Sequence, residues 1–81
     1  WTPVLAEQIA RDSDIPSLTQ KHWTVLSFCR EDAATHGKPP SLPRIARLTG
    51  ISMRELHELF PGDPGKLAAK IAGLQSSGQS L

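Results

Sequence analysis

The segment Leu18-Thr-Gln-Lys-His-Trp-Thr-Val-Leu-Ser-Phe-Cys-Arg30 decides the fold, because it predicts the longest helix of the chain. Thr19 is placed to cap this helix, and Gly37, followed by Pro39 and Pro40, is placed to end it. Its apolar residues cover a broad face, which is typical of a helix at the centre of a small core. These residues are Trp23, Val25, Leu26, Phe28 and Cys29.

A shorter helix is predicted before this segment, over residues 3–12. The hydroxyl of Thr2 can cap it, and the proline that follows fits the first helical position. Leu5 and Ile9 recur four residues apart, as on one face of a helix. The stretch Asp12-Ser-Asp-Ile-Pro16 then breaks the pattern.

Two further helices follow the central one. The first begins after Ser41 and ends at Gly50, which suits a left-handed terminating residue. Its apolar side is formed by Leu42, Ile45, Ala46 and Thr49. The second runs from Met53 to about Phe60 and has the clearest start, because Ser52 and Glu55 match a capping box. Ile51 and Leu56 stand at the two positions of a hydrophobic staple.

A fifth helix is predicted from Pro64, with Asp63 as its cap and Gly73 as its end. Its apolar residues are Leu67, Ile71 and Leu74. Residues 75–81 are rich in Ser, Gly and Gln, so we expect a flexible C-terminal arm attached to one helical domain over residues 1–74. Because strand-like alternation is absent from the sequence, the predicted fold class is all-α, a small five-helix bundle.

The composition and charge of the chain exclude few classes of function. The 81 residues carry a formal net charge of +1, which does not by itself indicate a nucleic-acid partner. No apolar run is long enough for a membrane span, and no signal-peptide pattern is present, so we expect a cytoplasmic protein without a membrane partner. The single cysteine is compatible with a reducing compartment.

The segment from Ile45 to Leu59 also looks like a helix-turn-helix, with Ala46 at the close approach of the helices and Gly50 in the turn. Such a unit is often only architecture. If it reads DNA, the candidate contacts are Arg44, Arg47, Ser52, Arg54 and His57. The second helix also carries two acidic residues, Glu55 and Glu58, and with the small net charge they favour architecture or protein contact over DNA readout.

No pattern in the sequence predicts catalysis or a cofactor. Cys29 lies inside the apolar face of the central helix, where a free cysteine packs as a small hydrophobic residue. The three histidines and Cys29 have no spacing typical of a metal site, so we predict none. The sequence also lacks a phosphate loop, a carboxylate pair and a dinucleotide fingerprint, and we expect a protein that is not an enzyme.

Three parts of the sequence together resemble one family. The segment Glu58-Leu-Phe-Pro-Gly-Asp-Pro-Gly-Lys66, continued by Ala69-Lys-Ile-Ala-Gly-Leu-Gln-Ser-Ser-Gly-Gln-Ser-Leu81, looks like the C-terminus of the DsrC/TusE family. The segment Leu18–Arg30 is similar to a family helix, and Trp1 followed by Ala6 and Ala10 is similar to its opening helix. The resemblance departs between Thr49 and Glu55, where the family has a longer basic, glycine-rich stretch. It implies a DsrC/TusE-type five-helix bundle containing the helix-turn-helix-like corner.

The family's two tail cysteines are replaced in this chain. Ala69 falls at the inner cysteine position, and Ser80 falls at the penultimate position, where the family forms persulfides or disulfides. Lys66 and Lys70 match basic residues that flank the inner cysteine and are candidates for partner binding. The resemblance implies a protein of sulfur metabolism that docks to sulfite reductase or sulfur-relay proteins without its own persulfide-carrying cysteine. The alternative is a helix-turn-helix transcriptional regulator.

Overall fold

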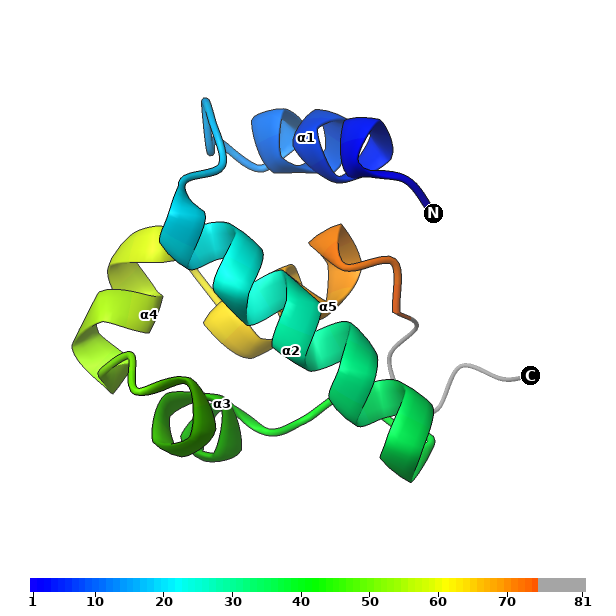
Figure 1. The fold of residues 1–81 in the computed structure, drawn as a ribbon. Helices are drawn as coiled ribbons and strands as arrows, with labels where there is room; N and C mark the ends of the chain where they lie inside the picture. The colour runs from blue at the N-terminus through cyan, green and yellow to red at the C-terminus, as the bar shows by residue number, and fades with distance from the viewer. Residues whose placement is uncertain (75–81) are drawn as a thin grey trace.

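The computed structural model describes residues 1–74 of the chain and forms an all-α fold over them (Figure 1). Its helices are α1 (Pro3–Asp12), α2 (Gln20–His36), α3 (Leu42–Thr49), α4 (Met53–Leu59) and α5 (Pro64–Ile71). These bounds agree with the five helices predicted from the sequence. The predicted arm over residues 75–81 lies outside the described residues.

The long helix α2 crosses the middle of the molecule, as predicted for a core helix (Figure 1). It packs against α3 and α5, while α1 packs on α5 and α4 lies against both α3 and α5. The largest fully buried side chains are Phe60, Leu26, Ile45, Leu56, Ile71, Val25 and Cys29. These large side chains come from four of the five helices and from the residue that ends α4, while α1 contributes the small residues Ala6 and Ala10 to the core.

Side-chain caps begin three of the helices. The hydroxyl of Thr2 accepts a hydrogen bond from the Leu5 N–H at 3.1 Å, in the first turn of α1. The helices α4 and α5 begin in the same way, through Ser52 and Asp63. Each cap satisfies an N–H group that the helix itself leaves free.

The capping box predicted at the start of α4 forms only in part. Ser52 Oγ accepts from the Glu55 N–H at 3.1 Å, as the box requires. The Glu55 carboxylate, however, pairs with the Lys21 ammonium group of α2. Across residues 1–74 the second bond of the box is absent, because this ion pair uses the carboxylate instead. The predicted staple positions, Ile51 and Leu56, are both buried.

The buried faces of α1 and α5 agree with the predicted ones only in part. Leu5 of α1 is 42% exposed, whereas Ala6 and Ala10 are fully buried. On α5 the fully buried residues include Ala68 and Ala72 alongside Ile71, while Leu67 and Leu74 are only partly buried. Alanine has no side-chain bulk beyond Cβ, so these two packed helices can approach closely. A search for large apolar residues finds Ile71 and the partly buried Leu67 and Leu74, but it does not find the buried alanines.

A buried histidine fastens the start of α2 to the end of α4. His22 is 5% exposed, its Nδ1 accepts from the Thr19 N–H at 3.0 Å, and its Nε2–H donates to the Leu59 carbonyl at 2.8 Å. Its ring also meets Phe60 edge-on, with 5.1 Å between centroids. The sequence reasoning gave His22 no structural role, although its place three residues after the cap Thr19 is the position of a capping-box partner.

Two further properties concern the part of the chain that the structure describes. None of the helices within residues 1–74 has the length and apolar character needed to cross a membrane. Over the same residues, His, Cys, Asp and Glu side chains do not gather in a group that could hold a metal ion.

Candidate functional site

The end of α5 has the geometry of a Schellman motif. Gly73 adopts φ +78°, its N–H donates to the Lys70 carbonyl at 3.1 Å, and the Leu74 N–H donates to the Ala69 carbonyl at 2.8 Å. This is the left-handed end that Gly73 predicted. It brings Leu74, the last described residue, back over Ala69, which the sequence resemblance aligns with the inner cysteine.

One aromatic side chain, Trp1, and one cationic side chain, Arg30, hold the C-terminal end of α5 in place. The Trp1 Nε1–H donates to the Ile71 carbonyl at 2.8 Å, and Arg30 Nη1 donates to the Ala72 carbonyl at 2.7 Å. The Arg30 guanidinium also lies over the Trp1 ring, 4.2 Å from its centroid, in cation–π contact. Carbonyl groups at the end of a helix lack partners within the helix, and here α1's N-terminus and α2 supply them.

Gly73 completes this arrangement, which we call the α5 clamp (Trp1, Arg30 and Gly73). A Cβ at position 73 would lie 2.2 Å from Trp1 Cδ1, closer than side-chain atoms can approach. Glycine is thus required both by its positive φ and by the close approach of the indole. In the sequence Trp1 and Arg30 stand out only as family-like residues, and no pattern in it predicts their contact across the fold.

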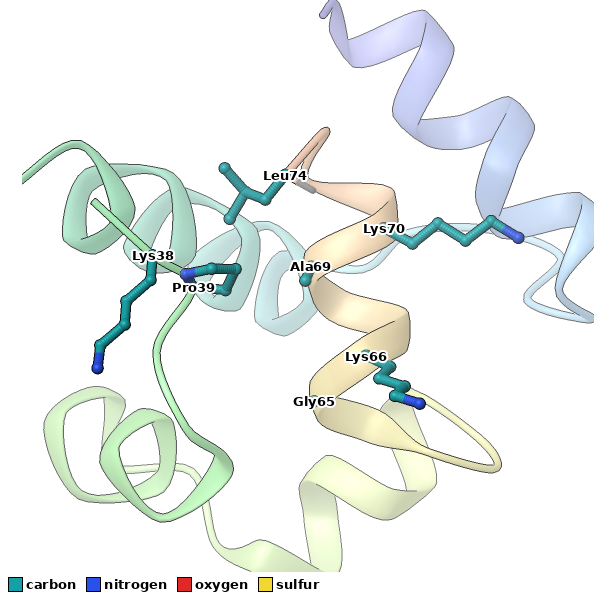
Figure 2. A pocket seen from close by; sticks show the side chains of 7 residues that line it. All are labelled: Lys38, Pro39, Gly65, Lys66, Ala69, Lys70 and Leu74. Carbon is teal, nitrogen blue, oxygen red and sulfur yellow. The ribbon is translucent and has the colours of Figure 1, made fainter. Parts of the chain in front are cut away.

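A groove opens along α5 next to the clamp (Figure 2). It has a volume of about 540 Å³ and lies between α5 and the connection from α2 to α3. The residues that line it are Lys38, Pro39, Gly65, Lys66, Ala69, Lys70 and Leu74. We call it the α5 groove. It brings together the predicted residues Lys66, Ala69 and Lys70, and it adds Lys38 and Pro39, which sequence reasoning did not connect with them.

The groove is apolar inside and basic at its edges. Figure 2 shows Ala69 and Leu74 directed toward Pro39, whereas the ends of Lys66 and Lys70 extend away from Pro39 on the other side of α5. Ala69 is 7% exposed, while the three lysines are exposed. Among residues 1–74, no carboxylate lines the groove. Ser80, the other position predicted from the family tail, lies outside the described residues.

Cys29, the single cysteine of the sequence, lies in the core as predicted. It is 1% exposed. Burial, with a smaller contribution from the charge of Asp32, raises the pKa of the Cys29 thiol to about 12. A thiol in this state is protonated near neutral pH and inaccessible, so it is not a nucleophile.

The basic residues of the helix-turn-helix-like corner are partly engaged inside the protein. Arg44 Nη2 donates to Asp32 Oδ1 at 2.8 Å, and Arg44 Nε lies 3.1 Å from both carboxylate oxygens. This hydrogen bonding holds the pKa of the buried Asp32 carboxyl below its usual value. It also raises the pKa of the Arg44 guanidinium. Arg44 therefore fastens α3 to α2, and its charge is largely compensated.

Most of the other candidate DNA contacts at the corner are also engaged within the protein. The Ser52 hydroxyl caps α4, and His57 Nδ1–H donates to the Met53 carbonyl of the same helix at 2.8 Å. Arg54 lies 3.9 Å from the Glu58 carboxylate, in an exposed pair. Arg47 is exposed on α3. The corner presents a weaker positive surface than the count of its basic residues implies.

Comparison with known proteins agrees with the family resemblance. The family model described as "DsrC like protein" matches residues 1–79. The chain belongs to the DsrC family. A relative in Nitratidesulfovibrio vulgaris, the gamma subunit of dissimilatory-type sulfite reductase, is 31% identical over 91% of this chain and 70% of its own length. The TusE sulfurtransferase of Salmonella choleraesuis is 35% identical over 91% of the chain and 73% of its own.

The structural comparison places the fold in the same family. A crystal structure of dissimilatory sulfite reductase I covers all of this chain and 78% of its own chain, with a TM-score of 0.88 and 27% sequence identity. Membership in the DsrC family makes this a protein of sulfur metabolism or sulfur relay. The comparisons do not support the DNA-binding alternative, and they do not confirm a helix-turn-helix function for the α3–α4 corner.

Proposed function

We propose that this chain acts in sulfur metabolism by docking to a protein partner, without carrying sulfur itself. The observation that carries the proposal is the state of its cysteines: Ala69 and Ser80 occupy the family's thiol positions, and Cys29 is buried. Sulfur transfer through a persulfide needs an accessible thiolate. These 81 residues offer none, and the α5 groove is the feature through which docking would act.

The same reasoning gives a non-catalytic role. The TusE relatives are named sulfurtransferases. That activity in this chain would require a thiol at one of the two positions aligned with the family's tail cysteines, and neither Ala69 nor Ser80 supplies one. The division into a helical domain, residues 1–74, and a docking arm, residues 75–81, is part of this proposal, as is the contribution of Lys66 and Lys70 to partner binding.

The proposal can be tested by measuring binding directly. The full chain is immobilised and exposed to purified dissimilatory sulfite reductase and, separately, to purified sulfur-relay proteins, with serum albumin as the unrelated control. We expect saturable binding to one of the two sulfur-metabolism samples. Binding to neither of them, with the chain correctly folded by circular dichroism, would contradict the proposal.

A further inference from the structure

The α5 groove combines an apolar interior with positive charge on two sides. Pro39, Ala69 and Leu74 form its interior, and Figure 2 shows them facing one another. Lys38 stands on the connection between α2 and α3, and Lys66 and Lys70 stand on α5. Such a surface fits a ligand that is apolar at one point and negatively charged around it.

These lysines are available to a partner. Their side chains are exposed, and within residues 1–74 none of them pairs with an acidic group. Two neighbouring hollows share Lys38 and Pro39 with the groove and add Arg30 and Arg44 to the basic residues at this end. Arg44 is compensated by Asp32 and Arg30 is used by the α5 clamp, so the lysines carry the free charge.

The α5 wall of the groove is held in a fixed shape. The clamp bonds the Ile71 and Ala72 carbonyls, and the Schellman motif fixes Leu74 above Ala69. A surface that is ordered before binding loses less conformational entropy when a partner arrives. The groove is thus suited to recognition of a short segment.

We propose that the α5 groove binds an acidic segment of a protein partner. An apolar side chain of that segment lies between Pro39, Ala69 and Leu74, and one flanking carboxylate lies near Lys38. The segment continues across α5, where another carboxylate meets Lys66 or Lys70, whose ends extend on the far side of that helix (Figure 2). This inference rests on the proposed docking function and names the chemistry of the partner surface.

The lining favours a protein partner over a single-stranded nucleic acid. Proteins that bind single strands stack the bases on aromatic side chains. Within the described part of the chain, residues 1–74, no aromatic residue lines the groove, and its interior is formed by small aliphatic groups. An aliphatic side chain such as leucine matches this interior better than a flat base does.

A peptide titration tests the inference. The probe is the blocked peptide acetyl-Glu-Glu-Leu-Glu-Glu-amide, added to the ¹⁵N-labelled full chain and followed by NMR. We expect the amide signals of Gly65, Ala69 and Leu74 to shift in a saturable way. The shifts should weaken when salt is raised from about 0.05 M to about 0.3 M, because salt screens exposed charges. Peptides with Gln for Glu, or Gly for Leu, should bind more weakly.

Two double variants distinguish an effect of the groove lysines from an effect of the net charge of the protein. Lys38→Gln with Lys66→Gln removes one positive charge from each side of the groove, and Arg47→Gln with Arg54→Gln removes two from the α3–α4 corner. We expect the first pair to weaken peptide binding on the order of fivefold and the second to leave it unchanged. All four residues are exposed, so both variants should keep the wild-type circular dichroism spectrum.

The inference would be overturned by no peptide binding, by equal effects of the two variants, or by tighter binding of a single-stranded oligonucleotide to the same residues. These results are distinct from those for the proposed function. If the lysine variant still binds the sulfur-metabolism protein as the wild type does, docking stands and the groove assignment fails. If the peptide binds but neither sulfur-metabolism sample does, the groove stands and the proposed function fails.

Discussion

The two basic regions of this molecule differ in what their positive charges contact. At the α3–α4 corner, Arg44 is bound to the buried Asp32, and Arg54 lies beside Glu58. At the α5 groove, Lys38, Lys66 and Lys70 are exposed, and over residues 1–74 they have no acidic partner. At the corner, Arg44 thus stabilises the fold and Arg54 has a neighbouring carboxylate, whereas the groove lysines remain available for recognition.

The largest expected effect tests whether the α3–α4 corner stabilises the fold. Leu56 is fully buried and α4 packs on α3, so Leu56→Ala removes core volume in a small domain. We expect a loss of about 2–4 kcal/mol in the free energy of unfolding, measured by urea denaturation. An unchanged unfolding midpoint would show that the corner does not contribute to the core in this way.

The next effect tests the α5 clamp at the groove end. Gly73→Ala forces a side chain onto a residue with φ +78° and displaces the Trp1 ring. We expect a loss of about 2 kcal/mol in the free energy of unfolding. In a Trp1→Ala background the same substitution should cost less, because the clash is gone. Equal costs in the two backgrounds would show that Gly73 and Trp1 are not coupled.

A smaller effect tests the ion pair that uses Arg44. The pKa of Asp32 lies below its usual value, so the ionised carboxyl stabilises the fold above the unfolded-state pKa of about 4. This stabilisation is lost as pH falls through the lower folded-state pKa. We expect Asp32→Asn to be less stable than the wild type at neutral pH, with the difference shrinking toward acid in urea denaturation. A difference independent of pH would contradict the assignment.

The smallest expected effect concerns DNA. Arg54 is exposed beside Glu58, and Ser52 is used as a cap, so Arg54→Ala should leave duplex binding weak and non-specific. Fluorescence anisotropy should give dissociation constants of about 10⁻⁴–10⁻⁶ M at physiological salt for both proteins. Sequence-selective binding at nanomolar concentration would reverse the contrast between the two regions.

The helices were predictable because their signals are local. Each signal lies within a few residues of the helix end that it defines. Ser52 and Asp63 cap helix starts, and the left-handed residues Gly37 and Gly50 end helices. Cys29 was placed in the core from its position on the apolar face of α2. The buried alanines of α1 and α5 were missed, because periodicity of large residues does not detect close packing between small ones.

The sequence pointed to residues of the α5 groove only where they align with the tail of the family. Ala69, Lys66 and Lys70 were found in that way, and the structure places all three along one groove. Lys38 and Pro39 could not be linked to them, since the connection between α2 and α3 approaches α5 only in the folded chain. The bond from Trp1 to Ile71 spans 70 residues, and no local pattern announces it.

Sulfur loading of the chain tests the central claim most directly. The full chain is incubated with a persulfide donor, and the mass of its C-terminal peptide is measured beside that of a Ser80→Cys variant. The account predicts no added sulfur on the wild type, because Ala69 and Ser80 carry no thiol and Cys29 is buried, and one added sulfur on the variant. A stable increment of one sulfur atom on the wild-type protein would contradict it.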